Sequence, residues 1–245
     1  MKLKSKKSIS YIISAYNESL IIKDSIEYCI KCLNDSFDEY EIILVNDGSI
    51  DKTGDIMDEI VNKNDKIKVL HNYINLNLGI SIQRALSIAS KDYVIFNAAD
   101  LPLDPSSTLT LLNLFDDGTD ILILQRKRYL GTNIWRKITS LINRFILLLF
   151  FPKEKWGIRD TNYIQVFKKE IIKKILPISR GPIFTWPEMI FRAKRLGLKI
   201  KTYDVDYNPK HIRKGAFGKP NDIIWGLYEM LRFRFKCFKI IKYNV

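Results

Sequence analysis

The sequence predicts an α/β protein with a mostly parallel central sheet, helices on both faces of it, and further amphipathic helices at the surface. Two observations carry this prediction. Short apolar segments alternate with helical ones over the first hundred residues, the arrangement of a parallel sheet covered on both faces. Polar residues then gather where the apolar segments end, and in such sheets ligands bind outside the carboxyl ends of the strands.

Each element follows from its local pattern. Runs of apolar residues predict strands at 10–16, 41–47, 66–72 and 92–98, and helical spacing of apolar residues predicts helices at 18–33, 51–62 and 80–89. No repeat, low-complexity run or Pro/Gly linker divides the chain. At 245 residues, with 47% hydrophobic and 27% charged residues, the chain suits one globular unit.

Polar turns follow the first, second and fourth predicted strands, as SAYNE, NDGSIDKT and the loop that holds Asp100. Gly48 permits a tight reversal, and Ser49 or Asp51 can cap the next helix. Asp47 is placed to accept hydrogen bonds from a base or a ribose. In a further turn, Gly79 lies at a helix start, where backbone amides can face an anion.

Positive charge is concentrated at the end of the chain. The net charge is +13, and residues 191–245 hold 14 Lys and Arg against 4 Asp and Glu, which favours an anionic partner such as phosphates, acidic lipids or nucleic acid. No segment has the roughly 20 apolar residues that span a bilayer. The segments 138–151 and 225–245 mix aromatic, aliphatic and basic residues. This favours helices lying in a membrane interface, over a buried core helix for 138–151 and over a solvated helix for 225–245.

Three cysteines in a Lys-rich chain that lacks a signal peptide suit a reducing cytoplasm. Cys29 and Cys32 form a single CxxC on a predicted helix, and two ligands do not make a structural zinc site, so we expect core packing. His71 and His211 are isolated in the sequence and receive no role.

These turns resemble the inverting family 2 glycosyltransferases, which have the Rossmann-like type A nucleotide-sugar fold. SAYNE is similar to the family's P-x-Y-N-E, VNDGSIDKT to V-D-D-G-S-x-D-x-T, and NLGIS to N-x-G-x-S/G. The resemblance covers about residues 8–220. It implies a nucleotide-sugar site at the following residues: Ala15, Tyr16, Glu18, Asp47, Ser49, Asp51, Gly79, Ala98, Ala99 and Asp100.

Within this family, the sequence most resembles the branch of the polyprenyl-phosphate glycosyltransferases, such as dolichol-phosphate mannosyltransferase. DILILQRKRY is similar to the branch's D-I-x-x-G-S-R-Y, which implies a phosphate-binding role for Arg126. WRKITSLIN is similar to W-x-x-R-K-x-I-S-x-x-N and implies that Arg136 and Ser140 hold the acceptor phosphate. A guanidinium group grips phosphate through a planar fork of donors, which agrees with these assignments.

Three later segments extend the resemblance with departures. RDTNYIQVFKK is similar to D-x-x-x-G-F-x-x-F-R/K without its glycine, so only Asp160 carries over. WPEMIFRAKRLG nominates Glu188 as a residue near the active site. HIRKGAFGKP is similar to R-x-x-G-x-S-K without its serine and nominates Arg213 and Lys219 for a diphosphate or the lipid phosphate.

The family's D-A-D-L-Q signature holds a divalent cation, but here it reads Ala98-Ala99-Asp100-Leu101-Pro102. Asn97 cannot replace the first aspartate, because neighbouring residues of a strand point to opposite faces. Asp100 alone predicts a weak Mg²⁺ or Mn²⁺ site. Three readings follow: an enzyme with weakly held metal helped by Arg126, Arg213 and Lys219, a degenerate member that binds without turnover, or an enzyme disabled by an introduced Ala98.

We expect a glycosyltransferase that moves a sugar from a nucleotide sugar to a polyprenyl (dolichyl or undecaprenyl) phosphate with inversion, using Asp100, Arg126 and Glu188. If the acceptor is instead a sugar hydroxyl in surface polysaccharide assembly, Glu188 or Asp160 is the candidate base. A nucleic-acid-binding module and a non-catalytic membrane scaffold are the rivals, and we expect no nucleic-acid partner.

The predicted organisation is a catalytic domain at 1–220, divided into a nucleotide-sugar half at 1–104 and an acceptor half at 105–220. A basic amphipathic helix at 221–245 follows, which we expect to associate with the membrane. We expect a peripheral location at the cytoplasmic face of the membrane. A membrane-spanning partner protein is a further expectation.

Overall fold

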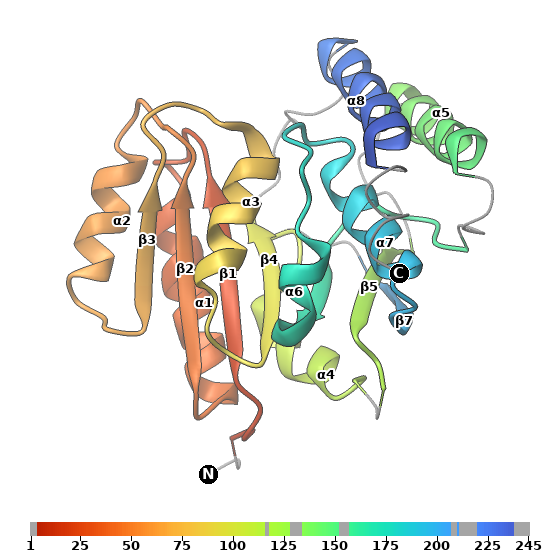
Figure 1. The fold of residues 1–245 in the computed structure, drawn as a ribbon. Helices are drawn as coiled ribbons and strands as arrows, with labels where there is room; N and C mark the ends of the chain where they lie inside the picture. The colour runs from red at the N-terminus through yellow and green to blue at the C-terminus, as the bar shows by residue number, and fades with distance from the viewer. Residues whose placement is uncertain are drawn as a thin grey trace.

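A seven-stranded, mostly parallel sheet forms the centre of the protein in this computed structural model (Figure 1). The structure describes residues 4–115, 118–127, 134–151, 157–206, 210 and 220–237, without the side chains of 134–140, 143, 220, 236 and 237. The strands are β1 (Ile9–Ala15), β2 (Tyr40–Asn46), β3 (Ile67–His71), β4 (Tyr93–Ala98), β5 (Ile121–Arg126), β6 (Gln165–Lys168) and β7 (Ile200–Val205). Their order across the sheet is β3-β2-β1-β4-β6-β5-β7.

Helices connect most of the strands. They are α1 (Ile22–Ser36), α2 (Thr53–Val61), α3 (Asn77–Ile88), α4 (Thr108–Leu112), α5 (Ile134–Phe150), α6 (Lys169–Ile175), α7 (Thr185–Arg195) and α8 (Pro220–Arg232), with the 3₁₀ turn η1 (Pro105–Ser107) and the π-helix η3 (Phe233–Cys237). Every strand and helix predicted in the first hundred residues is present, with ends shifted by up to four residues. The α/β prediction is therefore confirmed.

The direction of the strands decides where their ends lie. β1 pairs in parallel with both β2 and β4, and β2 pairs in parallel with β3. β6 runs antiparallel to β4 and to β5, so β5 points the same way as β4. The carboxyl ends of β1, β2, β3, β4 and β5 consequently share one edge of the sheet.

Two hydrophobic cores lie on the two faces of the sheet. On one face, side chains of α3, α6 and α7 cover the sheet together with Leu147 of α5 and Phe233 of η3. On the other, α1, α2 and α4 pack against it, and Cys29 lies in this core. The expectation that Cys29 and Cys32 are core residues is confirmed, because both are buried as free thiols. Burial raises the pKa of the Cys29 thiol.

The predicted helix at 221–245 is described as far as residue 237. It is α-helical to Arg232 and continues as the π-helix η3, while residues 238–245 lie outside the described part of the chain. In the part of the chain that the structure describes, no helix is both long and apolar enough to cross a bilayer.

A buried carboxylate supports the edge of the sheet opposite the predicted site. Glu41, at the start of β2, accepts hydrogen bonds from Ser10 Oγ and Lys68 Nζ, both at 2.6 Å, and from the Ser90 amide at 2.6 Å. Burial alone would raise the pKa of Glu41, but these hydrogen bonds lower it from 4.5 to about 2. The ionised form is therefore stabilised by the fold.

We expect Glu41→Gln to lower the free energy of unfolding at pH 7 by on the order of 3 kcal/mol. Because folding depresses this pKa, the stabilisation is complete above pH 4.5 and is lost as the pH falls toward 2. Urea unfolding between pH 7 and 3 measures this, with Glu39→Gln, a change in the exposed Lys91–Glu39 pair, as control. A destabilisation that does not shrink at low pH would contradict the ionised role.

Candidate functional site

The polar turns after β1 and β2 are joined by hydrogen bonds at the carboxyl edge of the sheet. The amide of Asn17 donates to Ser49 Oγ at 3.0 Å, and Asn17 Oδ1 accepts from the Ile50 amide at 2.9 Å. The Glu18 amide donates to Thr53 Oγ1 at 2.7 Å. Asn17 has a φ of 56°, and asparagine tolerates this left-handed conformation better than most residues. These hydrogen bonds join the two turns into one rim.

Asp51 strengthens the same rim. Its carboxylate accepts from the Ser19 amide at 3.1 Å and from the Thr53 amide at 3.0 Å. Burial raises the pKa of Asp51, but the hydrogen bonds from these donors and from the Thr53 hydroxyl together outweigh burial and lower the pKa from 3.8 to about 2. In this structure Asp51 ties two turns together and starts α2, so its predicted contact with the nucleoside stays a prediction.

Asp47, directly after β2, is held by residues from the β3–α3 connection. Its Oδ1 accepts from Asn72 Nδ2 at 2.7 Å and from the Leu76 amide at 3.0 Å. Asn72 Nδ2 also donates to Ser81 Oγ at 2.9 Å, and Arg84 Nη1 donates to Asn72 Oδ1. The orientation of the Asp47 carboxylate is therefore fixed from α3.

Sequence reasoning did not identify Asn72 or Arg84 as site residues. The signal for Asn72 was available, since it follows β3 at the same edge of the sheet as the residues that were found. Arg84 had no such signal, because it lies inside a helix and reaches Asn72 only when α3 packs on the sheet. Both are positioning residues for Asp47.

The two glycines differ in what they do. Gly48 has a φ of 73°, and a Cβ there would lie 2.2 Å from the carbonyl carbon of Ile74, so the tight reversal needs glycine. Gly79 was expected to present its amide to an anion. In the structure this amide donates to the Arg180 carbonyl at 3.0 Å, and a Cβ would lie 2.2 Å from the Ser179 carbonyl oxygen. Gly79 instead permits close contact between α3 and the chain before α7.

The predicted metal position lies at the end of β4. Asn97 Nδ2 donates to Tyr11 Oη at 2.7 Å and to the Leu103 carbonyl at 2.8 Å, so its side chain is buried on the other face, as predicted from strand geometry. Ala98 supplies a methyl group. Asp100 follows, half-buried, just before Leu101, which has a φ of 47°.

These residues fit a divalent cation poorly. Magnesium and manganese prefer oxygen ligands and in nucleotide sites take one or two carboxylates along with phosphate oxygens and water. The side chain of Ala98 offers no oxygen, and the Asn97 side chain is directed to the other face. Among the described residues, no group of three or more His, Cys, Asp or Glu side chains is arranged to hold a metal ion.

Arg126 and Asp160 form an ion pair beside the Asp100 loop. Arg126 Nε donates to Asp160 Oδ2 at 2.6 Å and Nη2 to Oδ1 at 3.1 Å, and the guanidinium lies 4.8 Å from the centre of the Tyr163 ring. Tyr163 Oη donates to the Pro102 carbonyl at 2.7 Å. The structure thus brings together two residues nominated from separate segments and connects both to the loop that carries Asp100.

Glu188 lies in the first turn of α7. It is 0% exposed and accepts from the amides of Ile178 and Ser179, both at 2.9 Å, and from Arg192 Nε at 2.7 Å. The Ser179 hydroxyl is a further donor to it. A carboxylate with these partners positions the chain before α7.

The remaining acceptor residues cannot be placed as side chains. Arg136 and Ser140 belong to α5, but their side chains lie outside the described part of the structure, and Arg213 and Lys219 lie outside the described residues altogether. Of the other donor residues, Ala15 and Ala99 are buried and Tyr16 is 43% exposed. The Ala15 carbonyl accepts from the Asp47 amide, and the Ala99 amide donates to the Ser14 carbonyl.

α5 and α8 each expose a row of apolar side chains, which we name the apolar stripes. The α5 stripe is between 41% and 66% exposed and consists of Leu141, Ile142, Phe145, Leu148 and Leu149. The stripe of α8 and η3 is between 37% and 70% exposed and consists of Ile224, Trp225, Tyr228, Leu231 and Phe235.

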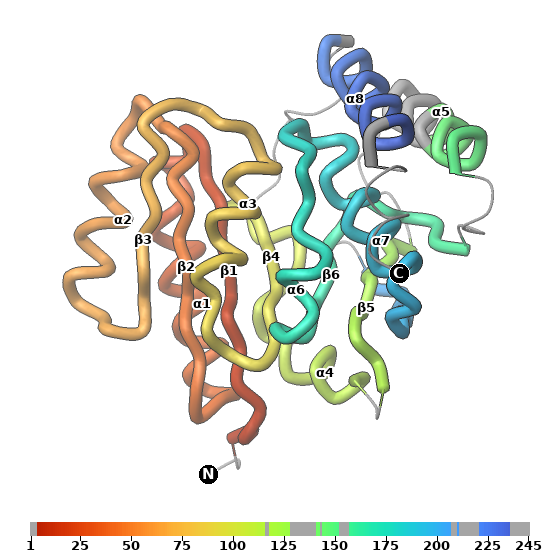
Figure 2. Tube along the Cα trace, in the orientation of Figure 1, coloured from red at the N-terminus to blue at the C-terminus, as the bar shows by residue number. Residues whose placement is uncertain are grey.

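The two helices lie side by side away from the sheet (Figure 2). The rings of Phe151 and Phe233 are 6.2 Å apart, and Arg234 Nη1 donates to the Phe150 carbonyl. Arg144 and Arg232 are exposed beside the stripes. The result is a surface that combines apolar side chains with positive charge.

Solved structures show the same fold. A crystal structure of glucosyl-3-phosphoglycerate synthase from Mycobacterium tuberculosis, in complex with Mn²⁺, UDP and glucosyl-3-phosphoglycerate, matches with a TM-score of 0.66 and 20% identity. The match covers 93% of this chain and 80% of that one. Mannosyl-3-phosphoglycerate synthase from Rubrobacter xylanophilus matches with a TM-score of 0.69 and 19% identity, over 97% of this chain and 75% of that one. The predicted type A glycosyltransferase fold is confirmed.

Curated relatives are similar in sequence over part of their length. Glycosyltransferase AglD of Haloferax volcanii is 24% identical over 82% of this chain and 33% of its own length. Undecaprenyl-phosphate 4-deoxy-4-formamido-L-arabinose transferase of Proteus mirabilis is 29% identical over 56% of this chain and 43% of its own length. The chain therefore spans less than half of these relatives.

A family model decides the assignment. The model described as "Glycosyl transferase family 2" matches residues 10–176, which include β1 to β6, the joined turns, Asp47, Asp100, Arg126 and Asp160. This is the family that the strand-end motifs resemble, and the match covers more than half of the chain. The chain belongs to glycosyl transferase family 2.

Proposed function

We propose that the chain transfers a sugar from a nucleotide sugar to a polyprenyl phosphate at a membrane surface, with inversion at the anomeric carbon. The observation that carries this proposal is the combination of an oriented arginine at the sheet edge with the apolar stripe of α5, the helix that follows it. Arg126 ends β5, and α5 begins at Ile134. A lipid phosphate needs both a cationic grip for its head and an apolar surface for its chain. The undecaprenyl-phosphate transferase among the relatives supports this acceptor class.

The reaction is a direct displacement. An oxygen of the acceptor phosphate attacks the anomeric carbon, and the bond from that carbon to the donor's diphosphate oxygen breaks. The nucleoside diphosphate leaves with the bonding electron pair. Because a phosphate is already anionic, no group has to remove a proton from it.

The state of the two candidate bases supports a phosphate acceptor. A hydroxyl acceptor would need a base within hydrogen-bond reach. Asp160 is buried and bound in a bidentate ion pair to Arg126, and Glu188 is fully buried among four donors. The oxygens of both carboxylates are therefore already engaged by donors within the fold. Transfer to a sugar hydroxyl is therefore the second candidate.

The donor is assigned to the rim formed by the turns after β1 and β2. Asp47, whose Oδ1 is engaged by Asn72 and Leu76, is the residue proposed to contact the nucleoside, with Ala15, Tyr16, Glu18 and Ser49 around it. Asp100 faces the sugar diphosphate in this proposal. Arg126, Arg136 and Ser140, with Arg213 and Lys219, are proposed for the phosphate groups.

The metal requirement is proposed to be weak. Structures of glucosyl-3-phosphoglycerate synthase contain Mn²⁺ or Mg²⁺ with UDP. In this chain Ala98 stands where the D-A-D-L-Q signature has its first aspartate, so only the carboxylate of Asp100 remains for a cation. Positive side chains are proposed to stabilise charge on the leaving diphosphate.

The chain is proposed to act as a peripheral protein at the cytoplasmic face of a membrane. The apolar stripes, the exposed Arg144 and Arg232, and the basic last quarter of the sequence suit an anionic bilayer. A membrane-spanning protein is a further proposed partner. Nucleic acid is not, because a strand-binding surface needs aromatic side chains along a basic groove, and the exposed aromatic side chains of α5, α8 and η3 lie within helical apolar stripes.

A turnover assay in detergent tests the proposal. The full chain is combined with a panel of nucleotide sugars, a short polyprenyl phosphate, and magnesium or manganese, and products are measured by mass spectrometry. We expect glycolipid and free nucleoside diphosphate in equal amounts. Glycosylation of a sugar acceptor without glycolipid would replace the proposal by the second candidate. Vesicle binding without any released nucleotide would indicate a degenerate member or a scaffold.

A further inference from the structure

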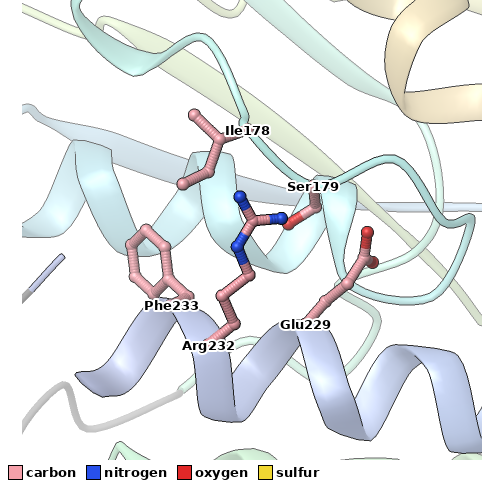
Figure 3. Close-up of a pocket in the computed structure, with 5 residues that line it drawn as sticks. All are labelled: Ile178, Ser179, Glu229, Arg232 and Phe233. Carbon is pink, nitrogen blue, oxygen red and sulfur yellow. The ribbon is translucent and has the colours of Figure 1, made fainter. Parts of the chain in front are cut away.

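Two buried carboxylates hold four consecutive backbone amides in the segment 178–181, between α6 and α7. Glu188 of α7 accepts from the amides of Ile178 and Ser179. Glu229 of α8 accepts from the Arg180 amide at 2.6 Å and from the Gly181 amide at 3.0 Å, both through Oε1. Figure 3 shows Glu229 and Arg232 extending from α8 toward this segment.

Glu229 is not a solvated residue of an amphipathic helix. It is 5% exposed, and burying a carboxylate is costly unless hydrogen bonds compensate it. Here the compensation comes from the segment 178–181. The geometry of this segment therefore depends on the position of α8.

α8 packs closely against the segment 178–181 and against Ile183, which follows it. A Cβ at Gly181 would lie 2.7 Å from Trp225 Cδ1, and a Cβ at Gly226 would lie 2.9 Å from Ile183 Cβ. Trp225 also belongs to the apolar stripe of α8. One side chain thus takes part both in the exposed stripe and in the packing against the segment.

The segment 178–181 also contacts the start of α3, which in turn holds Asp47 of the proposed donor site. The Arg180 carbonyl accepts from the Gly79 amide in the first turn of α3. Three residues earlier, the Leu76 amide donates to Asp47 Oδ1. The beginning of α3 is thus fixed between the segment 178–181 and the carboxylate assigned to the nucleoside.

We propose that Glu229 is a positioning residue that couples the docking of α8 on an anionic membrane to the affinity of the donor site for its nucleotide. This inference rests on the proposed function. A bilayer that contacts the stripe of α8 favours the docked position of that helix, in which Glu229 holds Arg180 and Gly181. The segment then supports Gly79 and the start of α3, and Asp47 keeps its orientation.

The experiment measures binding of UDP and of GDP to the full chain by calorimetry, with and without vesicles. Mixed phosphatidylcholine and phosphatidylglycerol vesicles are compared with pure phosphatidylcholine vesicles. For the unmodified chain we expect anionic vesicles to tighten nucleotide binding by about 5-fold or more, the lower end of measured couplings between sites. For Glu229→Ala we expect this gain to disappear.

Two matched variants separate coupling from general damage. Glu229→Gln should keep most of the gain, because its amide oxygen can accept both hydrogen bonds that Oε1 accepts and only the longer contact from the Gly181 amide to Oε2, at 3.3 Å, is lost. Asp222→Ala removes a carboxylate from the first turn of the same helix and should keep the whole gain. If Glu229→Ala does not fold, Gly79→Ala tests the coupling instead. Its Cβ would displace the Ser179 carbonyl and so disturb the contact between α3 and the segment 178–181, which should also abolish the gain in nucleotide affinity.

The outcomes distinguish this inference from the proposed function. An equal gain in Glu229→Ala and the unmodified chain, or no gain in the unmodified chain, would overturn the coupling, and turnover of a polyprenyl phosphate would still support the function. Failure of the unmodified chain to bind UDP or GDP in any condition, together with no turnover of any nucleotide sugar of the panel, would overturn both.

Discussion

Introducing a carboxylate with Ala98→Asp is expected to raise turnover in the presence of Mn²⁺ by about 10-fold or more, and to make activity dependent on the metal. Ala98 ends β4, two residues before Asp100, on the face of the strand opposite to Asn97. An aspartate there adds a second hard oxygen ligand beside the diphosphate. The unmodified chain is expected to change by less than about 3-fold when the metal is chelated, because one carboxylate holds the cation weakly.

Turnover is measured against Mn²⁺ and Mg²⁺ concentration for the unmodified chain, Ala98→Asp and Ala98→Asn. The asparagine variant is the matched control, because it has nearly the same size without the charge. Equal metal dependence in all three proteins would show that position 98 does not face the cation. Activity in Ala98→Asp alone would show that the alanine disables an otherwise complete site.

Arg126→Lys is expected to lower kcat/KM by about 10²-fold, although it keeps the positive charge. Arg126 forms two hydrogen bonds to Asp160 and lies over the Tyr163 ring, and the bidentate contact with Asp160 needs a planar guanidinium. A lysine ammonium cannot make the bidentate contact. The larger part of the loss should appear in the KM for the lipid phosphate if Arg126 binds the acceptor.

Two variants accompany this measurement. Asp160→Asn weakens the contact that orients Arg126 and should cause a smaller loss, about 10-fold. Arg159→Lys alters a neighbouring arginine whose pair with Asp204 is about half exposed, and it should stay within about 2-fold. Thermal unfolding is followed in parallel. If Arg126→Lys loses much stability but its folded fraction turns over substrate at the unmodified rate, the Arg126–Asp160 pair contributes to folding stability and not to the reaction.

Much of the fold was available from the sequence. The alternation of apolar and helical segments gave the parallel strands β1 to β4 and their helices, because each pattern reflects which side chains are buried on the two sides of one element. The same local rule placed Asp47 and Asp100 at the carboxyl edge and directed Asn97 away from it, as the hydrogen bonds to Tyr11 and Leu103 confirm.

The insertion of β6 between β4 and β5 was not foreseen, although it decides that Arg126 lies at the same edge as Asp100. β6 is only four residues long, and its neighbours come from distant parts of the chain. The same reason explains Gly79. The sequence suggested that its amide faces an anion, but in the structure this amide donates to the Arg180 carbonyl, more than 100 residues away in the chain. A local pattern shows which hydrogen-bond donors and acceptors a residue has, but it does not show which groups from elsewhere in the chain bind to them.

The sequence by itself determined the α/β class, the edge of the sheet where the candidate site lies, and the residue types of its rim. The tertiary structure alone decided which of these residues act together: Asn72 and Arg84 with Asp47, Arg126 with Asp160, and Glu229 with the segment 178–181. Arg126 and Asp160 are 34 residues apart, and Glu229 is 49 residues from Arg180. Such pairs form only when separate elements pack, since their hydrogen bonds depend on the relative positions of helices and strands rather than on the periodicity within any one of them.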